Sequence, residues 1–365
     1  MYEVTAMIRT RTFLAVVVMV VGVQMALCAP VIKGIALCVQ PLPGESSAGY
    51  GLGNLALVTL PGRKPVLLFP TVPADLPPTN GVRDAWLLDG GRLVLIHARH
   101  ASDDKAGYLL LANPTRSKHS IIAGAVDTDS IVLVSPNKKA VFYYDKAQGL
   151  VVWHTDGSKI AVQPPKGWKS GYCEDWSPRM PHLRLTYWRI GSETSRDFWL
   201  DERTGALKPI APADPWLKAL DMCKGKSLIV DDHNCLWLKA PGRRKIELAH
   251  LEAGEMTSPG GWCRFSPDGR YVICTAEGFG LPDGGSTYKT YCFDLRRRRP
   301  VQLKASGQSF YYITSDEFID WYSKEGGILH KCFDELRWTD FPSLKTSKVA
   351  TLPDKCEFVD FIRTP

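Results

Sequence analysis

The sequence lacks the short motifs that mark several catalytic and metal-binding folds. None of its 10 cysteines stands in a Cys-x-x-Cys pair, which argues against a zinc ribbon or a thioredoxin-like redox site. No Gly-x-Ser-x-Gly sequence occurs that would form a hydrolase nucleophile elbow. Helix-period patterns are few, whereas 31 glycines and 26 prolines separate short apolar runs. We therefore predict an all-β protein and assign no catalytic residue and no cofactor.

A strong excess of charge is also missing. The 45 Lys and Arg residues are scattered among 38 Asp and Glu residues, for a formal net charge of +7. So modest and dispersed a charge does not indicate a nucleic-acid partner. Four consecutive arginines at residues 296–299 lie where one predicted strand turns into the next. We interpret this run as a solvated turn, with an anionic partner as the alternative.

The apolar run near the N-terminus is short for a membrane span, which needs about 20 residues. It covers residues 13–27, follows Arg9 and Arg11, and ends in small residues before Pro30. These features are typical of a secretory signal. We expect a signal peptide at residues 1–28, cleaved after Cys28, and a single extracytoplasmic domain at residues 29–365. A lipidated Cys28 and an uncleaved membrane anchor are the alternatives.

One segment has the pattern of a complete four-stranded antiparallel unit. Apolar residues lead into Ser266-Pro267-Asp268-Gly269 and a β-rich run leaves it, which predicts a tight hairpin. A third run covers residues 288–295 and a fourth covers residues 300–303. The unit spans roughly 43 residues, about the size of one propeller blade.

Weaker copies of this unit recur at a regular spacing. Pro136 to Pro178 is 42 residues, and Pro178 to Pro267 is 89 residues, or two steps. A period in the forties with four strands per unit is typical of a β-propeller. We predict seven four-stranded antiparallel blades; six and eight are the alternatives because the first and fifth units are weak. The seventh unit is expected to open at residues 310–314.

The first unit lacks an opening strand, and the end of the chain supplies a candidate. Residues 356–362 are strand-like, so we expect them to pair with the first unit and close the ring, which removes exposed sheet edges. In this alignment Cys356 corresponds to Cys263, and Cys38 corresponds to Cys274. We therefore predict the disulfides Cys38–Cys356 and Cys263–Cys274.

The complete unit carries a family resemblance. Its strand, Ser-Pro-Asp-Gly turn, second strand, third strand ending in Phe293-Asp294-Leu295 and short last strand resemble the WD40-like (PD40-type) repeat of TolB-type β-propellers over residues 265–303. The resemblance implies an exported propeller used for binding or scaffolding. In other members the propeller serves as a lid or domain of a peptidase or lyase, but this chain shows no attached catalytic domain.

The candidate site residues come from the loops expected on one face of the propeller, where ligands usually bind. The loops between second and third strands are expected to include residues 97–106 and 231–233, and those between blades to include residues 70–80 and 252–261. Imidazole and carboxylate donors in the first two can hold a divalent ion, or a histidine can act as a base; solvated loop polarity is the alternative. Trp262 is interpreted either as packing between blades or as a platform for a ligand. The candidate binding residues are His97, His100, Asp231, Asp232, His233 and Trp262.

The leading functional hypothesis is an exported monomer that binds a protein, peptide or glycan on its loop-rich face. The first alternative is a metal-assisted lyase or hydrolase acting on a polysaccharide. A purely structural role in the cell envelope is the second. Membrane contact is expected only if the N-terminal segment is retained.

Overall fold

The computed structural model describes most of the chain between residues 33 and 363. The described residues are 33–39, 51–60, 64–103, 105–116, 118–127, 132–172, 179–180, 182–231, 233, 235–250, 255–256, 263–266, 268–279, 286–297, 299–301, 304–305, 308–309, 320–322, 327–332, 335–340, 346–351 and 357–363. In these ranges no helix is both long and apolar enough to cross a membrane. The division into residues 1–28 and 29–365 stays a prediction.

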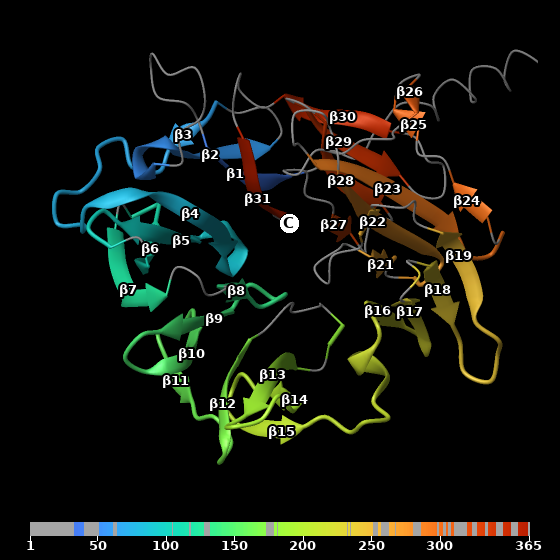
Figure 1. Cartoon of the computed structure of the whole chain (residues 1–365). Coiled ribbons are helices and arrows are strands. Elements are labelled where there is room, and N and C mark those ends of the chain that lie inside the picture. Colours follow the sequence, from blue (N-terminus) through green and yellow to red (C-terminus); the bar gives the residue numbers. More distant parts are fainter. Residues whose placement is uncertain are drawn as a thin grey trace, which may run out of the picture. The chain divides into compact units, whose positions relative to one another are not determined.

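Nearly all regular structure in the described residues is antiparallel β-sheet, mostly in groups of four strands that follow one another along the sequence (Figure 1). We number the sheets in chain order. The first sheet contains β31 (Glu357–Arg363), β1 (Gly34–Val39), β2 (Leu55–Leu60) and β3 (Val66–Leu67). The second contains β4 (Thr79–Leu88), β5 (Leu93–His100), β6 (Ala106–Asn113) and β7 (Lys118–Asp127), and the third contains β8 (Leu133–Val134), β9 (Ala140–Asp145), β10 (Gly149–His154) and β11 (Lys159–Val162). A single pair, Val126 of β7 opposite Asp145 of β9, joins the second and third groups into one eight-stranded sheet.

The remaining sheets repeat this arrangement. The fourth contains β12 (Trp168–Tyr172), β13 (Leu183–Arg189), β14 (Ser195–Leu200) and β15 (Leu207–Pro209), and the fifth contains β16 (Asp221–Cys223), β17 (Lys226–Val230), β18 (Cys235–Lys239) and β19 (Ile246–His250). The sixth contains β20 (Glu255–Met256), β21 (Cys263–Phe265), β22 (Tyr271–Phe279), β23 (Ser286–Asp294) and β24 (Arg299–Val301). β25 (Lys304–Ala305) pairs with β26 (Gln308–Ser309), and the last sheet contains β27 (Asp320–Tyr322), β28 (Gly327–Cys332), β29 (Glu335–Asp340) and β30 (Thr346–Thr351). The short 3-10 helices are Leu52–Asn54, Asp89–Gly91 and Pro215–Leu217.

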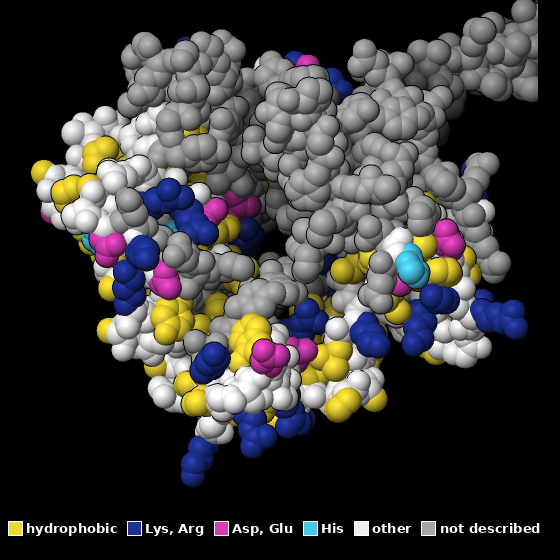
Figure 2. All heavy atoms as spheres, in the orientation of Figure 1, with side chains coloured by type: hydrophobic (Ala, Val, Ile, Leu, Met, Phe, Trp, Pro, Cys, Tyr) yellow, Lys and Arg dark blue, Asp and Glu magenta, His cyan; other side chains and the backbone are white. Residues whose placement is uncertain are grey.

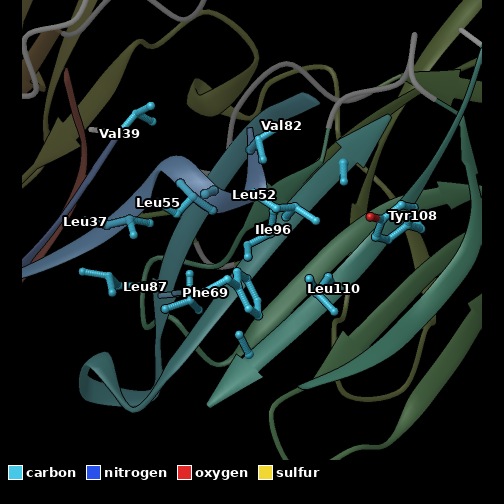
Figure 3. Close-up of a cluster of buried hydrophobic side chains, with 14 residues drawn as sticks. Leu37, Val39, Leu52, Leu55, Phe69, Val82, Leu87, Ile96, Tyr108 and Leu110 are labelled. Carbon is cyan, nitrogen blue, oxygen red and sulfur yellow. The ribbon is translucent and has the colours of Figure 1, made fainter. Parts of the chain in front are cut away.

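Successive sheets are joined by shared hydrophobic clusters, which is the packing of a β-propeller. Leu37 and Leu55 of the first sheet pack with Leu87, Ile96 and Tyr108 of the second, and Figure 3 shows these side chains converging in one cluster. Further clusters join the second sheet to the third, the third to the fourth, and the fifth to the sixth. These sheets confirm the all-β fold and the four-stranded antiparallel blade. The number of blades stays a prediction.

The second sheet shows why its strands are apolar on both faces. Ile96 lies in the cluster shared with the first sheet, while its neighbour Leu95 lies in the cluster shared with the third. Successive residues of a strand point to opposite faces, so a sheet covered on both sides needs a continuous apolar run. The sequence of β5 satisfies this requirement from Val94 to Ile96, where each residue is completely buried.

The predicted hairpin turn and its weaker copy have the same hydrogen bonds. The Ser266 hydroxyl accepts from the Tyr271 backbone N–H at 2.9 Å, and the Ser135 hydroxyl accepts from the Ala140 backbone N–H at 2.8 Å. Each hydroxyl also donates to the side-chain oxygen two residues later, at 2.5 Å for Asp268 and 2.7 Å for Asn137. The Ser-Pro-Asx sequence therefore stabilises the same hydrogen-bonded turn in both sheets.

Some strand boundaries differ from those predicted. β5 runs to His100 and β4 begins at Thr79, so the predicted loops at residues 97–106 and 70–80 are both shorter than expected. In the last sheet, β27, β28 and β30 overlap strands that the sequence predicts, whereas β29 was not predicted. The predicted opening strand at residues 310–314 lies outside the described residues.

The C-terminal strand returns to the start of the fold. β31 pairs with β1 over Gly34–Val39, with one irregularity between Leu37 and Cys38. Asp360 of β31 is buried and its carboxylate accepts hydrogen bonds from the Leu87 backbone N–H and the Lys138 ammonium, both at 2.8 Å. One carboxylate thus connects the first sheet with the second and third.

Asp221 makes the equivalent contact farther along the chain. It lies in β16 and accepts from the Phe265 backbone N–H of β21 at 2.8 Å and from the Arg179 guanidinium at 2.5 Å. In both cases a completely or nearly completely buried aspartate accepts a backbone hydrogen bond from a strand of the following sheet and pairs with a cation. Sequence reasoning did not identify either residue.

Candidate functional site

The two histidines predicted in a loop belong to strand β5 instead. Residues 97–100 continue the pairing with β4, in which His97 lies opposite Asp84. His97 is completely buried, and this burial lowers its pKa to about 4. The Nε2 atom of His100 lies 3.2 Å from the Gly124 carbonyl oxygen. Because residues three apart on a strand point to opposite faces, these imidazoles do not share a site.

Asp231 lies after β17, as predicted, but its carboxylate is engaged by its own neighbours. One oxygen accepts from the backbone N–H groups of His233 at 3.1 Å and Cys235 at 3.0 Å. The other accepts from Trp237 Nε1 at 2.6 Å and lies 3.9 Å from Lys245 Nζ. The bond from the Cys235 N–H is the largest of the effects that lower the pKa of this carboxyl. The geometry is that of an aspartate that shapes a turn.

The other members of the predicted site are not brought together by the described structure. Asp232 and Trp262 lie outside the described residues. Across the ranges that the structure describes, no three His, Cys, Asp or Glu side chains form a group suited to a metal ion. A binding role for His97, His100, Asp231 and His233 stays a prediction.

The predicted disulfides fall on strands with defined registers. Cys263 of β21 is disulfide-bonded, and Cys274 of β22 lies directly opposite it in the register. Cys38 is completely buried in β1, opposite Phe358 of β31, while Cys356 lies outside the described residues. The pairings Cys263–Cys274 and Cys38–Cys356 stay predictions.

A cavity of about 130 Å³ lies between the connection that leaves β3 and the hairpin that joins β6 to β7. We call it the His119 cavity. It is lined by residues 68–71 and 73 of the connection and by residues 112–114, 118 and 119 of the hairpin region. Hydrophobic side chains gather at the left margin of the face in Figure 2, over the connection between β3 and β4.

The hairpin side of the cavity is fixed by a proline turn. Asn113 precedes Pro114, and the Asn113 side-chain oxygen accepts from the Thr115 hydroxyl at 2.8 Å and the Arg116 backbone N–H at 3.2 Å. Asn followed by Pro is a favoured start of a type I turn because proline presets the φ angle of the second position. This turn places Lys118 and His119 at the beginning of β7.

The other side of the cavity is fixed by Phe69 and a second turn. Phe69 is buried, and its ring meets the His119 ring edge to face with centroids 6.5 Å apart. The Leu76 N–H donates to the Pro73 carbonyl at 3.3 Å, and this turn carries Asp75. Asp75 Oδ2 lies 3.0 Å from His119 Nε2, and this hydrogen bond is the largest effect lowering the Asp75 pKa.

The chemistry of the cavity combines an apolar wall with oriented polar groups. Since a carboxylate can only accept, Nε2 of His119 must carry the hydrogen, which leaves Nδ1 as an acceptor in the neutral ring. The exposed Lys118 adds an ammonium group at the rim. Such a site can hold a ligand by hydrophobic contact and by hydrogen bonds, and a carboxylate-oriented imidazole can also act as a general base.

Sequence reasoning did not find this site. It did mark the proline-rich stretch 70–80 as a connection between units, and this stretch supplies Asp75. The partner His119 lies 44 residues away, and no local pattern links the two. A single histidine at the start of a strand does not indicate a binding site in the sequence, because its neighbours become known only with the register of β6 and β7.

No protein-family model matches the sequence, and the curated proteins include no match. Solved structures with a similar chain fold include an oligogalacturonate lyase in complex with manganese, at 15% identity and a TM-score of 0.45, over 88% of this chain and 86% of that chain. TolB from Acinetobacter baumannii is similar at 11% identity and a TM-score of 0.38, over 90% and 67%. The β-propeller domain of the Trilobed protease from Pyrococcus furiosus is similar at 11% identity and a TM-score of 0.39, over 74% and 84%. None of these likenesses assigns a residue or an activity to this protein.

Proposed function

We propose that this protein is an exported, monomeric β-propeller that binds a protein, peptide or glycan without changing it chemically, and that the His119 cavity is a binding site. It acts outside the cytoplasm, in the periplasm or as a secreted protein. The observation that carries the proposal is the cavity itself, in which the Phe69 ring, prolines and a carboxylate-oriented imidazole surround a space of about 130 Å³. A preformed cavity of this kind needs little reorganisation to accept a ligand.

The cavity can be tested by filling it from the rim. Thr71 lines the cavity and is exposed, so Thr71→Trp places an indole over the opening with little effect on the core. We expect wild-type protein, screened on peptide and glycan arrays, to retain a ligand that Thr71→Trp fails to bind. Thr194→Trp, at an exposed threonine between β13 and β14, is the matched control and should bind like wild type.

The competing function, a metal-assisted lyase or hydrolase, predicts different results. It requires a stoichiometric metal in the purified protein and cleavage of a polysaccharide that stops when the metal is removed. Metal analysis together with product analysis on acidic and neutral polysaccharides therefore separates the two functions. A metal-dependent cleavage activity would overturn the binding proposal.

A further inference from the structure

Exposed apolar residues lie close in sequence to the residues that line the His119 cavity. The large hydrophobic residues that are most exposed in the described part of the chain are Val66, Val72, Ile121 and Ile190. Val66, Val72 and Ile121 lie within two residues of a residue that lines the cavity, whereas Ile190 lies in the fourth sheet region. Exposed apolar side chains that gather around one concave site are typical of an interaction surface.

The volume of the cavity limits what can enter it. An apolar protein cavity of roughly 150 Å³ accommodates one benzene molecule. At about 130 Å³, the His119 cavity matches one aromatic ring or one branched aliphatic side chain. The exposed residues Val66, Val72 and Ile121, which are close in sequence to the lining residues, would then be available to contact the atoms on either side of that anchor.

The first half of the strand beside the cavity has one edge to which no described strand is paired. Residues Lys118 to Ile121 of β7 pair with β6 on one side. On the other side, β7 pairs with β9 only through Val126, so the described residues provide no strand partner for its first half. An extended peptide can add to such an edge through its backbone groups while a side chain enters a neighbouring pocket.

The charges at the rim favour one kind of peptide. Lys118 and Arg116 are both exposed on the hairpin, and the cationic side chains have no ion-pair partner in the described residues. The acidic residue at the rim, Asp75, is held by His119. A partner that brings negative charge to this edge therefore gains electrostatic attraction, whereas a basic partner is repelled.

We infer that the His119 cavity and the adjoining edge of β7 bind an extended, acidic peptide segment through one apolar anchor side chain. This inference rests on the proposed binding function and gives the chemical class of its ligand. The anchor fills the cavity that Phe69 and His119 line, and the acidic flanks lie along Lys118 and Arg116.

The test uses short fluorescein-labelled peptides with one central Phe, flanked by Asp, Glu and Ser, and measures binding to the folded protein by fluorescence anisotropy. The comparison sets replace the acidic residues with Lys and Arg, replace the whole flank with Ser and Gly, or replace the central Phe with Ala. We expect the acidic Phe peptides to bind, with a loss of about tenfold for the central Ala. Raising the salt concentration should weaken this binding.

Two variants locate the binding site. Thr71→Trp should abolish binding of the acidic peptide, and Lys118→Glu should weaken it about tenfold. Lys166→Glu, at an exposed lysine between β11 and β12, is the matched charge control and should leave the affinity unchanged. Hydrogen exchange on the complex should show slower exchange of the amides at residues 118–121.

The outcomes separate this inference from the proposed function. If no acidic peptide binds, or if Thr71→Trp binds it as tightly as wild type, the inference is wrong. Binding of a glycan or of an uncharged peptide that Thr71→Trp abolishes would overturn the acidic-peptide inference and support the proposed function. Loss of the acidic peptide in Thr71→Trp, with protection of residues 118–121, would support both.

Discussion

At the scale of a single residue, His97 makes the stability of the protein depend on pH. Both of its ring nitrogens lack a hydrogen-bond partner within the described residues, and burial, together with Arg83 and Arg99, lowers its pKa to about 4. The unfolded chain binds the same proton with a pKa near 6.5. Stability should therefore fall as the pH drops from about 6.5 to about 4, by up to about 3 kcal/mol from this residue.

Urea unfolding of wild type and His97→Leu at pH 7, 5.5 and 4 measures this contribution. The variant should lose less stability than wild type over this range, because its unfolded chain has no proton to gain at residue 97. His100→Gln, at the partly buried end of the same strand, is the control for loss of an imidazole from β5. Equal pH dependence of His97→Leu and wild type would contradict the assignment.

At the scale of one structural element, the hairpin turn at Ser266 depends on Gly269. Gly269 has a φ of +69°, and a Cβ atom there would lie 3.0 Å from the Cys223 sulfur. Gly242 has a φ of +66° with no atom within 4 Å of such a Cβ, and Gly124 has neither constraint. The cost of substitution by Ala should thus rise from near zero at Gly124 to about 1 kcal/mol at Gly242 and about 2 kcal/mol at Gly269.

Equilibrium unfolding of the three Ala variants tests this order. The comparison of Gly269→Ala with Gly242→Ala isolates the packing of the turn against Cys223, since both residues have left-handed backbone angles. If the two variants were equally stable, the turn would not be packed as the structure has it.

The same elements show how far the sequence could predict the fold. The turns at Ser135 and Ser266 were predictable because side chain and backbone interact within six residues. The end of β5 was not, because His97 to His100 are polar or small and become strand only through pairing with β4. The His119 cavity was not predictable either, since Asp75 and His119 meet through the register of separate strands.

At the scale of the whole molecule, Asp360 holds the C-terminal strand to two other sheets. Asp360→Ala removes the acceptor of the Leu87 N–H and leaves Lys138 without its carboxylate, which should cost about 3 kcal/mol of unfolding free energy. Asp360→Asn keeps an oxygen for the Leu87 N–H and should cost less, about 1 to 2 kcal/mol.

A comparison with an exposed ion pair separates the effect of burial on the unfolding free energy from the effect of charge alone. Asp103 Oδ2 lies 3.5 Å from Lys146 Nζ at the surface, so Asp103→Ala should cost less than about 1 kcal/mol. Asp221→Ala, which removes the equivalent buried contact with Phe265 and Arg179, should be as damaging as Asp360→Ala.

Chemical denaturation of the four variants gives this order directly. If Asp360→Ala resembled Asp103→Ala while Asp221→Ala remained severe, the C-terminal strand would contribute little to holding the sheets together. An equal loss of unfolding free energy in Asp360→Ala and Asp221→Ala would mean that this contact stabilises the packing of successive sheets in general, and that the C-terminal strand uses the same contact as β16.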